Sequence, residues 1–290
     1  MSWSPPTTLP EVGAGHTLLD IGGGARLKRF ADRVTDRPHP AALGARGEPA
    51  AWAGADLRYD RDRGWTGSAA ARTPWAMTID GLTLELRPTD AGQVGAFPEH
   101  VAMLPWLRAR IAGTGGSEAT PAVLHLFAYT GLATLAMVAA GAAVTHVDAA
   151  RPTVAWARHN AESSGLADRP VRWIVDDAVA FAAREVRRGR RYAGVVLDPP
   201  SYGHGPGSGA WRIDEDLDHL LAACARLIEP DGFALLTAHT AGFDADRLAG
   251  HLATVLGRPA AAIDAGELEL TTPDGRRLGL GAFARTAGGA

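Results

Sequence analysis

Residues Val123-Leu-His-Leu-Phe-Ala-Tyr-Thr-Gly131 run directly into the apolar segment 132–140. The first five form a short, nearly uninterrupted apolar run, which predicts a buried β-strand at Val123–Phe127. The next four, Ala128–Gly131, are small or polar and end in glycine, which favours a tight turn. Because a strand, a turn and a helix follow one another in this order, the segment predicts the start of an α/β fold.

The same alternation continues on the C-terminal side. Strands that are separated by helices form a mostly parallel sheet with helices on both faces, and this is the fold that the pattern predicts. The predicted strands are Val123–Phe127, Ala143–Val147, Val171–Val175, Tyr192–Leu197 and Phe233–Thr237. The predicted helices cover residues 132–140, 152–164, 178–188, 212–229 and 244–256. A closing hairpin is predicted from Glu267–Thr271 and Leu278–Phe283.

The residues before this region have a different, β-rich character. Two hairpins are predicted, the first with three glycines in its turn and the second with Asp80-Gly81. Their strands are Leu18–Ile21 with Leu27–Phe30, and Met77–Ile79 with Leu82–Leu86. Residues 36–74 are predicted as long loops and Pro98–Ala112 as a helix. We therefore expect a small β-rich domain at residues 1–115, with substrate recognition as its candidate role, and an α/β domain at residues 116–290.

Composition narrows the class of protein. The 290 residues carry a net charge of −3, with 46% hydrophobic and 21% charged residues, which is typical of a globular chain. The single cysteine, Cys224, excludes an intramolecular disulfide and argues against a cysteine-based zinc site. The first residues lack the charged and apolar regions of a secretory signal, and no apolar run is long enough to span a bilayer. We expect a cytoplasmic protein without a metal or a membrane partner.

Small or acidic residues follow the first four predicted α/β strands. Ligands of open α/β sheets lie at the carboxyl ends of the strands, so these residues are candidates for a binding site. The turn Ala128–Gly131 lets the backbone approach a ligand closely. Asp148 is placed to accept from both ribose hydroxyls, and Asp176 or Asp177 from an adenine amino group. A nucleoside cofactor is the favoured interpretation, and the alternative is that these residues only cap helices and solvate strand ends.

The fourth strand ends in Leu197-Asp198-Pro199-Pro200-Ser201-Tyr202. Two prolines lack N–H donors, so this strand end exposes carbonyl groups beside the Asp198 carboxylate. Such acceptors hold an amino group while its lone pair points at an electrophile. Tyr202 is suited to stack on a flat ring. The sequence therefore predicts an amine-binding catalytic site made of Asp198, Pro199, Pro200 and Tyr202.

These strings resemble the class I S-adenosylmethionine (SAM)-dependent methyltransferases, and within them the branch that contains bacterial large-subunit ribosomal RNA methyltransferases. The resemblance covers roughly residues 93–240 and implies a Rossmann-like sheet with SAM as methyl donor. The matching strings are Leu124–Gly131, Thr145–Asp148, Trp156–Asn160, Asp176–Ala178 and Leu197–Ser201. The upstream stretch Gln93–His100 resembles a family segment that lies over SAM. The cofactor residues implied are Phe97, Glu99, Phe127, Ala128, Tyr129, Thr130, Gly131, Asp148, Ala149, Asp176, Asp177, Ala178 and Asp198.

Departures from the family bear on the substrate. His125 stands where an acidic or amide residue is common, and the RNA-binding module of some relatives is not recognisable. The family's 5-methylcytosine enzymes use cysteine nucleophiles, and none lies near Asp198–Tyr202, so transfer to nitrogen is favoured. The first hypothesis is N-methylation of a nucleobase in RNA, as in ribosomal RNA processing. A small nitrogen heterocycle or amine is the alternative, supported by the mild acidity and by a possible glycine-rich lid at Gly203–Gly209. A non-catalytic SAM- or RNA-binding protein is the third hypothesis.

One basic cluster stands out, at Arg184, Arg187, Arg188, Arg190 and Arg191. Two interpretations are open. The arginines could contact phosphates, or they could be a solvated helix end, where cations suit the helix dipole. The second interpretation is the favoured one.

Overall fold

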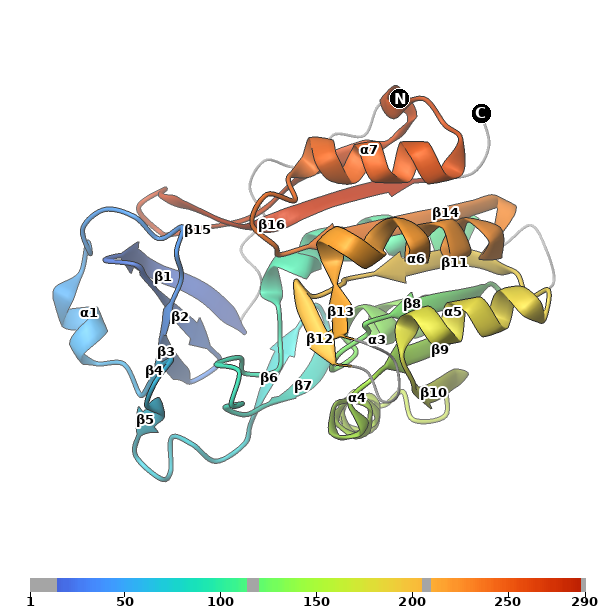
Figure 1. Ribbon diagram of the computed structural model, residues 1–290. Helices are drawn as coiled ribbons and strands as arrows, with labels where there is room; N and C mark the ends of the chain where they lie inside the picture. The colour runs from blue at the N-terminus through green and yellow to red at the C-terminus, as the bar shows by residue number, and fades with distance from the viewer. Residues whose placement is uncertain (1–14, 114–119, 205–209, 288–290) are drawn as a thin grey trace. The chain divides into compact units, whose positions relative to one another are not determined.

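The computed structural model describes residues 15–113, 120–204 and 210–287. Its internal contacts divide the chain into two compact units (Figure 1). The N-terminal unit comprises Met1–Ala102 and Glu269–Leu280, and the C-terminal unit comprises Met103–Leu268 and Gly281–Ala290. The boundary expected at residues 115 and 116 lies outside the described residues and stays a prediction, as does the lid, whose residues 205–209 are also outside them.

The N-terminal unit contains a five-stranded sheet with the strand order β1-β2-β3-β4-β5. The strands are β1 His16–Gly22, β2 Ala25–Phe30, β3 Arg33–Pro38, β4 Leu57–Asp60 and β5 Gly64–Gly67. A short helix, α1 Pro49–Ala53, and a separate hairpin of β6 Trp75–Ile79 and β7 Leu82–Leu86 complete it. The β-rich character and both predicted hairpins are confirmed.

The prediction of long loops over residues 36–74 is wrong in part. This stretch contains the end of β3, all of α1, and the strands β4 and β5. The strand β3 was missed because its buried positions are Thr35 and Arg37 rather than apolar residues, so it lacks the alternating pattern that marks a half-buried strand.

Most of the second sheet lies in the C-terminal unit, and its order is β10-β9-β8-β11-β14-β16-β15. The first five of these strands pair in parallel, and β16 pairs antiparallel with β14. The bounds are β8 Ala122–Leu126, β9 Ala143–Asp148, β10 Val171–Val175, β11 Tyr192–Leu197, β14 Ile228–Ala238, β15 Asp264–Thr271 and β16 Arg277–Thr286. The chain leaves β8 in one direction and returns to place β11 on its other side. The strand order therefore reverses between β8 and β11, which is where ligands bind in open α/β sheets.

Helices cover both faces of this sheet. Helices α5, α6 and α7 lie along one face and bury an apolar cluster with Leu126, Val147 and Leu197 (Figure 1). On the other face, Thr134 of α3 contacts His125 of β8 and His146 of β9. The bounds are α2 Leu104–Gly113, α3 Leu132–Ala139, α4 Arg151–Ser163, α5 Ala178–Arg187, α6 Ile213–Leu227 and α7 Ala245–Leu256. The predicted α/β architecture is confirmed, and Cys224 is a buried residue of α6.

Smaller elements connect the main ones. The helix predicted at 98–112 is divided into a 3₁₀ turn, η1 Pro98–Met103, and α2. The division follows from Pro105, which has no N–H to donate to the carbonyl four residues earlier. Short strands β12 Tyr202–His204 and β13 Ala210–Arg212 pair after the Asp198 strand end, and η2 spans Ala260–Ala262. Across the described ranges, no helix combines the length and the apolar content that crossing a membrane requires.

Candidate cofactor and acceptor site

The turn after β8 has an unusual backbone. Phe127 and Tyr129 have φ values of 53° and 48°, and Gly131 has a φ of 92°. Side chains other than glycine rarely adopt the left-handed region, and two of them in one turn cost about 1–3 kcal/mol each. Surrounding contacts must therefore hold the turn in this conformation, and such strain is common where a ligand is clamped.

Two neighbouring elements, β9 and α4, supply those contacts. The Ala128 N–H donates to the Val147 carbonyl at 3.1 Å, which ties the turn to β9. The side-chain amide of Asn160, buried in α4, donates to the Thr130 carbonyl at 2.9 Å. A Cβ at Gly131 would lie 3.2 Å from the Cβ of Ala157, so the close approach of α4 favours glycine there. Ala128 and Thr130 are buried, and Phe127 and Tyr129 are half-buried.

Asp148, the last residue of β9, is held by two backbone donors. Its Oδ2 accepts from the Tyr129 N–H and its Oδ1 from the Ala150 N–H, each at 3.0 Å. Burial raises the pKa of the Asp148 carboxyl above its ordinary value, while these two hydrogen bonds act in the opposite direction. Each oxygen retains a lone pair, so the carboxylate is oriented to accept from two neighbouring hydroxyls, as a ribose presents them. Ala149, half-buried, follows it directly.

Asp176 and Asp177 follow β10 and differ in their contacts. Asp176 forms an ion pair with Arg184 and accepts from the Asp177 N–H at 2.9 Å. Asp177 is the N-cap of α5, where its Oδ1 accepts from the Ala180 N–H at 2.8 Å. Its other oxygen accepts no hydrogen bond from the described residues, so Asp177 retains more capacity for a ligand than Asp176. Ala178, buried, opens the helix.

A hydroxyl bridge lies beneath the turn. The Thr134 Oγ1 is 2.7 Å from the Nδ1 of His125 and 2.9 Å from the Nδ1 of His146. One hydroxyl proton serves only one of the two nitrogens, so one histidine donates to Thr134 and the other accepts from it. Burial lowers the pKa of His146 to about 3, and this ring is therefore neutral. The bridge joins β8, α3 and β9 at the base of the turn.

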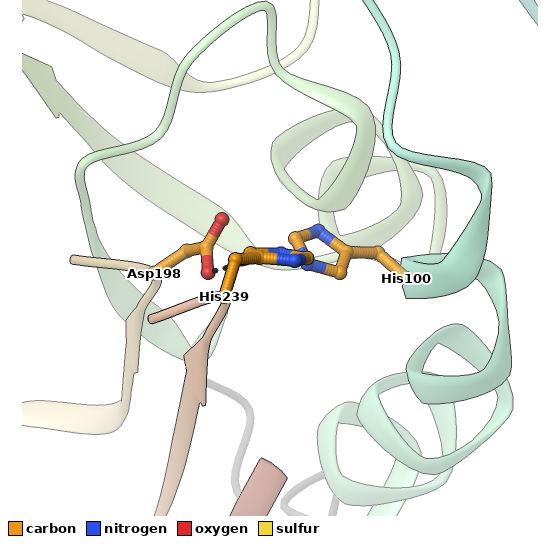
Figure 2. A group of neighbouring side chains, drawn as sticks. All are labelled: His100, Asp198 and His239. Carbon is orange, nitrogen blue, oxygen red and sulfur yellow. Dashed lines mark ion pairs between the residues drawn. The ribbon is translucent and has the colours of Figure 1, made fainter. Parts of the chain in front are cut away.

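Asp198 lies at the end of β11, next to β14 in the sheet. The Thr237 hydroxyl donates to its Oδ1 at 2.7 Å, and the Nε2 of His239 lies 3.6 Å from the same oxygen (Figure 2). The pairing of Leu126 with Leu197 places the Asp198 strand end directly beside the end of β8. Asp198 therefore lies at the reversal of strand order, next to the turn that begins at Phe127.

The carbonyls of the two prolines are not equivalent. The Trp211 Nε1–H donates to the Pro200 carbonyl at 2.7 Å, which engages one of the acceptors that the sequence predicted to be exposed. The Pro199 carbonyl accepts no hydrogen bond within the described parts of the chain. Trp211 thus fixes the strand end and leaves Asp198 and the Pro199 carbonyl as the candidate acceptors. Tyr202 begins β12 and its ring is 51% exposed.

Phe97 and Glu99 belong to the N-terminal unit. The Phe97 ring lies 5.8 Å from the ring of His100. Glu99 is buried, and its Oε2 lies 3.5 Å from the Nζ of Lys28, whose pKa burial lowers well below its ordinary range. The Lys28–Glu99 contact is one that sequence spacing could not indicate. A role of Phe97 and Glu99 in cofactor binding remains a prediction.

The sequence analysis gives no role to Thr134, Asn160 or Thr237. Thr237 and His239 lie at the end of the fifth predicted strand, and reading that strand end like the first four would have found both. Asn160 is part of a string that matches the family, yet its contact with Thr130 depends on packing of α4 against the turn. The Thr134 bridge carries no local signal at all.

Curated relatives cover only part of this chain. No protein-family model matches it. It is 34% identical over 128 residues to the ribosomal RNA large subunit methyltransferase K/L of Methylococcus capsulatus, which is 43% of this chain and 17% of that protein. It is 31% identical over 155 residues to the protein of the same name from Magnetococcus marinus, which is 52% of this chain and 20% of that one. The chain thus spans about a fifth of the length of these relatives.

A solved structure covers nearly all of it. The crystal structure of the SAM-dependent methyltransferase from Agrobacterium tumefaciens is 32% identical, superposes with a TM-score of 0.87, and matches 97% of this chain and 93% of its own. The match covers residues of both units. This chain belongs to the SAM-dependent methyltransferases.

Proposed function

We propose that the chain transfers the methyl group of SAM to a nitrogen of a nucleobase in ribosomal RNA. The observation that carries the proposal is the position of Asp198, an acceptor at the reversal of strand order, directly beside the strand that leads into the cofactor turn. The names of the two curated relatives supply the substrate class. A nitrogen acceptor is consistent with Cys224, whose pKa burial raises to about 12, so it does not serve as a nucleophile.

The cofactor-binding roles follow the contacts. The turn formed by Phe127, Ala128, Tyr129, Thr130 and Gly131 encloses the methionine part of SAM. Asp148 accepts from the ribose hydroxyls, with Ala149 beside the ring. Asp177 accepts from the adenine amino group, with Ala178 nearby, and Asp176 orients Asp177 through its N–H. Phe97 and Glu99 are proposed to lie over the cofactor.

SAM supplies an electrophilic methyl group on a sulfonium. Asp198 and the Pro199 carbonyl accept the hydrogens of the target amino group, which directs its lone pair at that methyl carbon. Thr237 holds the Asp198 carboxylate in place. As the N–C bond forms, the methyl–sulfur bond breaks and S-adenosylhomocysteine leaves with the electron pair. The positive charge that develops on the nitrogen is stabilised by the Asp198 carboxylate and is removed when the nitrogen releases a proton to water. Tyr202 stacks on the base, and Pro200, fixed by Trp211, sets the direction of the strand end.

The N-terminal unit is proposed to take part in substrate recognition. A cytoplasmic location is proposed as well, since a ribosomal RNA substrate is found there. Both statements depend on the substrate class and share its test.

The test is transfer of a labelled methyl group from SAM to an unmodified transcript of large-subunit ribosomal RNA, followed by nuclease digestion and identification of the labelled nucleoside. An N-methylated base in the wild type, lost in Asp198→Asn, supports the proposal. Label in small heterocycles or amines but not in RNA would contradict the substrate class. SAM binding without transfer to any acceptor would contradict enzymatic activity.

A further inference from the structure

Several arginines lie close together at the amino ends of the parallel strands, opposite the candidate site. Helix α5 ends at Arg187, and four residues link it to the start of β11 at Tyr192. A surface depression of about 240 Å³ lies there, lined by Val186, Gly189, Arg190, Arg191 and Arg226. We call Arg187, Arg188, Arg190, Arg191 and Arg226 the arginine patch. All five are exposed.

The arginines of this region differ in what holds them. Arg184 forms an ion pair with Asp176, and Arg188 forms one with Glu185 at 3.0 Å. Arg191 donates to the carbonyls of Arg226 and, at 3.3 Å, of Ile228, so it caps the end of α6. Arg187, Arg190 and Arg226 form no ion pair with any residue in the described ranges. The depression therefore presents a fixed guanidinium, Arg191, next to Arg190 and Arg226, which have no counter-charge.

Favourable interaction with the helix dipoles at the ends of α5 and α6 does not account for the number of arginines there. A helix end is served by one or two cations, whereas five gather around the ends of α5 and α6 in a chain whose net charge is −3. Like charges held close together repel, and the repulsion is relieved when an anion lies among them. The planar fork of arginine binds phosphate oxygens in a bidentate manner.

We propose that the arginine patch binds the phosphate backbone of the RNA substrate. The inference rests on the proposed function, because it assumes that the methyl acceptor belongs to an RNA. It adds a contact surface on the end of the sheet away from the acceptor site. The residues at the acceptor end are acidic and repel phosphates, so an RNA that presents a base to Asp198 needs cations elsewhere to be attracted.

The distance between the arginine patch and Asp198 distinguishes an RNA substrate from a small one. Strand β11 has six residues, and at about 3.3 Å per residue it places the patch roughly 20 Å from Asp198. A single heterocycle at Asp198 does not span that distance. A folded RNA does, since double-stranded RNA is commonly contacted over about 16 base pairs. Dependence of activity on the patch would therefore be specific to an RNA substrate.

The experiment measures binding of the unmodified ribosomal RNA transcript as a function of salt concentration. The triple variant Arg187→Gln, Arg190→Gln, Arg226→Gln should weaken binding by on the order of ten- to a hundredfold at low salt, and should lower the salt slope by about 2–3, or about one unit per lost phosphate contact. The single variant Arg190→Gln should lower the slope by about 1. Its matched control is Arg158→Gln, an exposed arginine on α4, which should leave the slope unchanged.

Calorimetric SAM affinity, expected to be unchanged in every variant, shows that the fold is intact. A triple variant that binds the RNA with wild-type affinity and slope would overturn the patch and leave the proposed function standing. A wild-type protein that neither binds nor methylates the transcript would overturn both. An equal loss in Arg158→Gln would mean that general charge, not the patch, attracts the RNA, and would also overturn the inference.

Discussion

The two ends of the parallel strands carry opposite charges and hold them differently. At the carboxyl end, Asp148, Asp177 and Asp198 each accept a hydrogen bond from a backbone N–H or a hydroxyl, which fixes the direction of the carboxylate. At the amino end, Arg190 and Arg226 are exposed and form no ion pair within the described residues. A ligand of fixed shape is matched by oriented groups. We propose that the exposed cations match a long polyanion.

The largest effect is expected at the carboxyl end, in Asp198→Asn. The amide lacks the negative charge that stabilises the developing cation, so kcat for methyl transfer should fall by about 10²- to 10³-fold. The affinity for SAM, measured by calorimetry, should change by less than about threefold, because the loss affects mainly the transition state.

Ser201→Ala is the control for this variant, since it removes the Ser201–Thr240 hydrogen bond of the same loop without touching the carboxylate. Near wild-type turnover is expected there. If Asp198→Asn retained the wild-type rate, the acceptor site would not be at the reversal of strand order. The difference in charge between the two strand ends would then not reflect methyl transfer.

A smaller effect is expected for Asp148→Ala. The loss of a charged acceptor for two ribose hydroxyls should raise the dissociation constant of SAM by about 10- to 100-fold. Calorimetric titration measures it, and Glu162→Gln, an exposed acid on α4, is the matched control. Unchanged SAM affinity would mean that the acid only holds Tyr129 and that the nucleoside lies elsewhere.

The Thr134 bridge tests whether the carboxyl end depends on buried support. Thr134→Val keeps the shape but leaves two buried imidazole nitrogens without the hydroxyl, which should lower the free energy of unfolding by about 2–3 kcal/mol. The SAM dissociation constant should rise several-fold with little change in kcat, since the turn loses its base. Thr134→Ser should restore both quantities. A variant that loses stability but binds SAM normally would show that the bridge does not position the turn.

Acid should weaken the support of the carboxyl end while leaving the arginine charges unaffected. The folded pKa of His146 is about 3, below the ordinary value of 6.5, so the unfolded chain takes up the proton first. Its contribution to stability is complete above pH 6.5 and is lost as the pH falls toward 3. Between pH 7 and pH 5 the loss is about 2 kcal/mol.

Urea unfolding of the wild type at both pH values measures this change. His146→Phe removes the titrating ring, so its own decrease between the two pH values should be smaller by that amount. An identical decrease in the variant would assign the acid sensitivity to other groups.

Burial on both faces makes the inner strands β8 and β11 nearly continuous apolar runs, and the sequence predicted them well. The predicted bounds of β10 and β11 agree with the structure at both ends. Asp148 and Asp198 were found for the same reason, since parallel strands end at one edge and the polar residue after each run marks it. The polar strand β3 was not predicted, because Thr35 and Arg37 occupy its buried positions.

Contacts between distant segments were beyond prediction. Nothing near Glu99 indicates that Lys28 is its partner, and nothing near Thr134 indicates two histidines. The composition of the arginine cluster was visible, but the depression and the lack of ion pairs at Arg190 and Arg226 depend on how α5 and α6 end beside β11.

The N-terminal unit is completed by the segment Glu269–Leu280, and this has a consequence for folding during synthesis. Leu18 and Ile21 share a buried cluster with Leu270, Leu278 and Leu280. Arg276 donates to the buried Asp20 at 2.5 Å, and hydrogen bonds from Trp52, Glu48 and Arg276 outweigh burial to bring the pKa of that acid to about 2. During synthesis the strand β1 therefore waits for residue 280 before its core closes. N-terminal parts usually fold first during synthesis, but here the cluster around Leu18 stays incomplete until Leu280 is made, and a nascent chain stalled before Leu270 would expose that apolar face to chaperones.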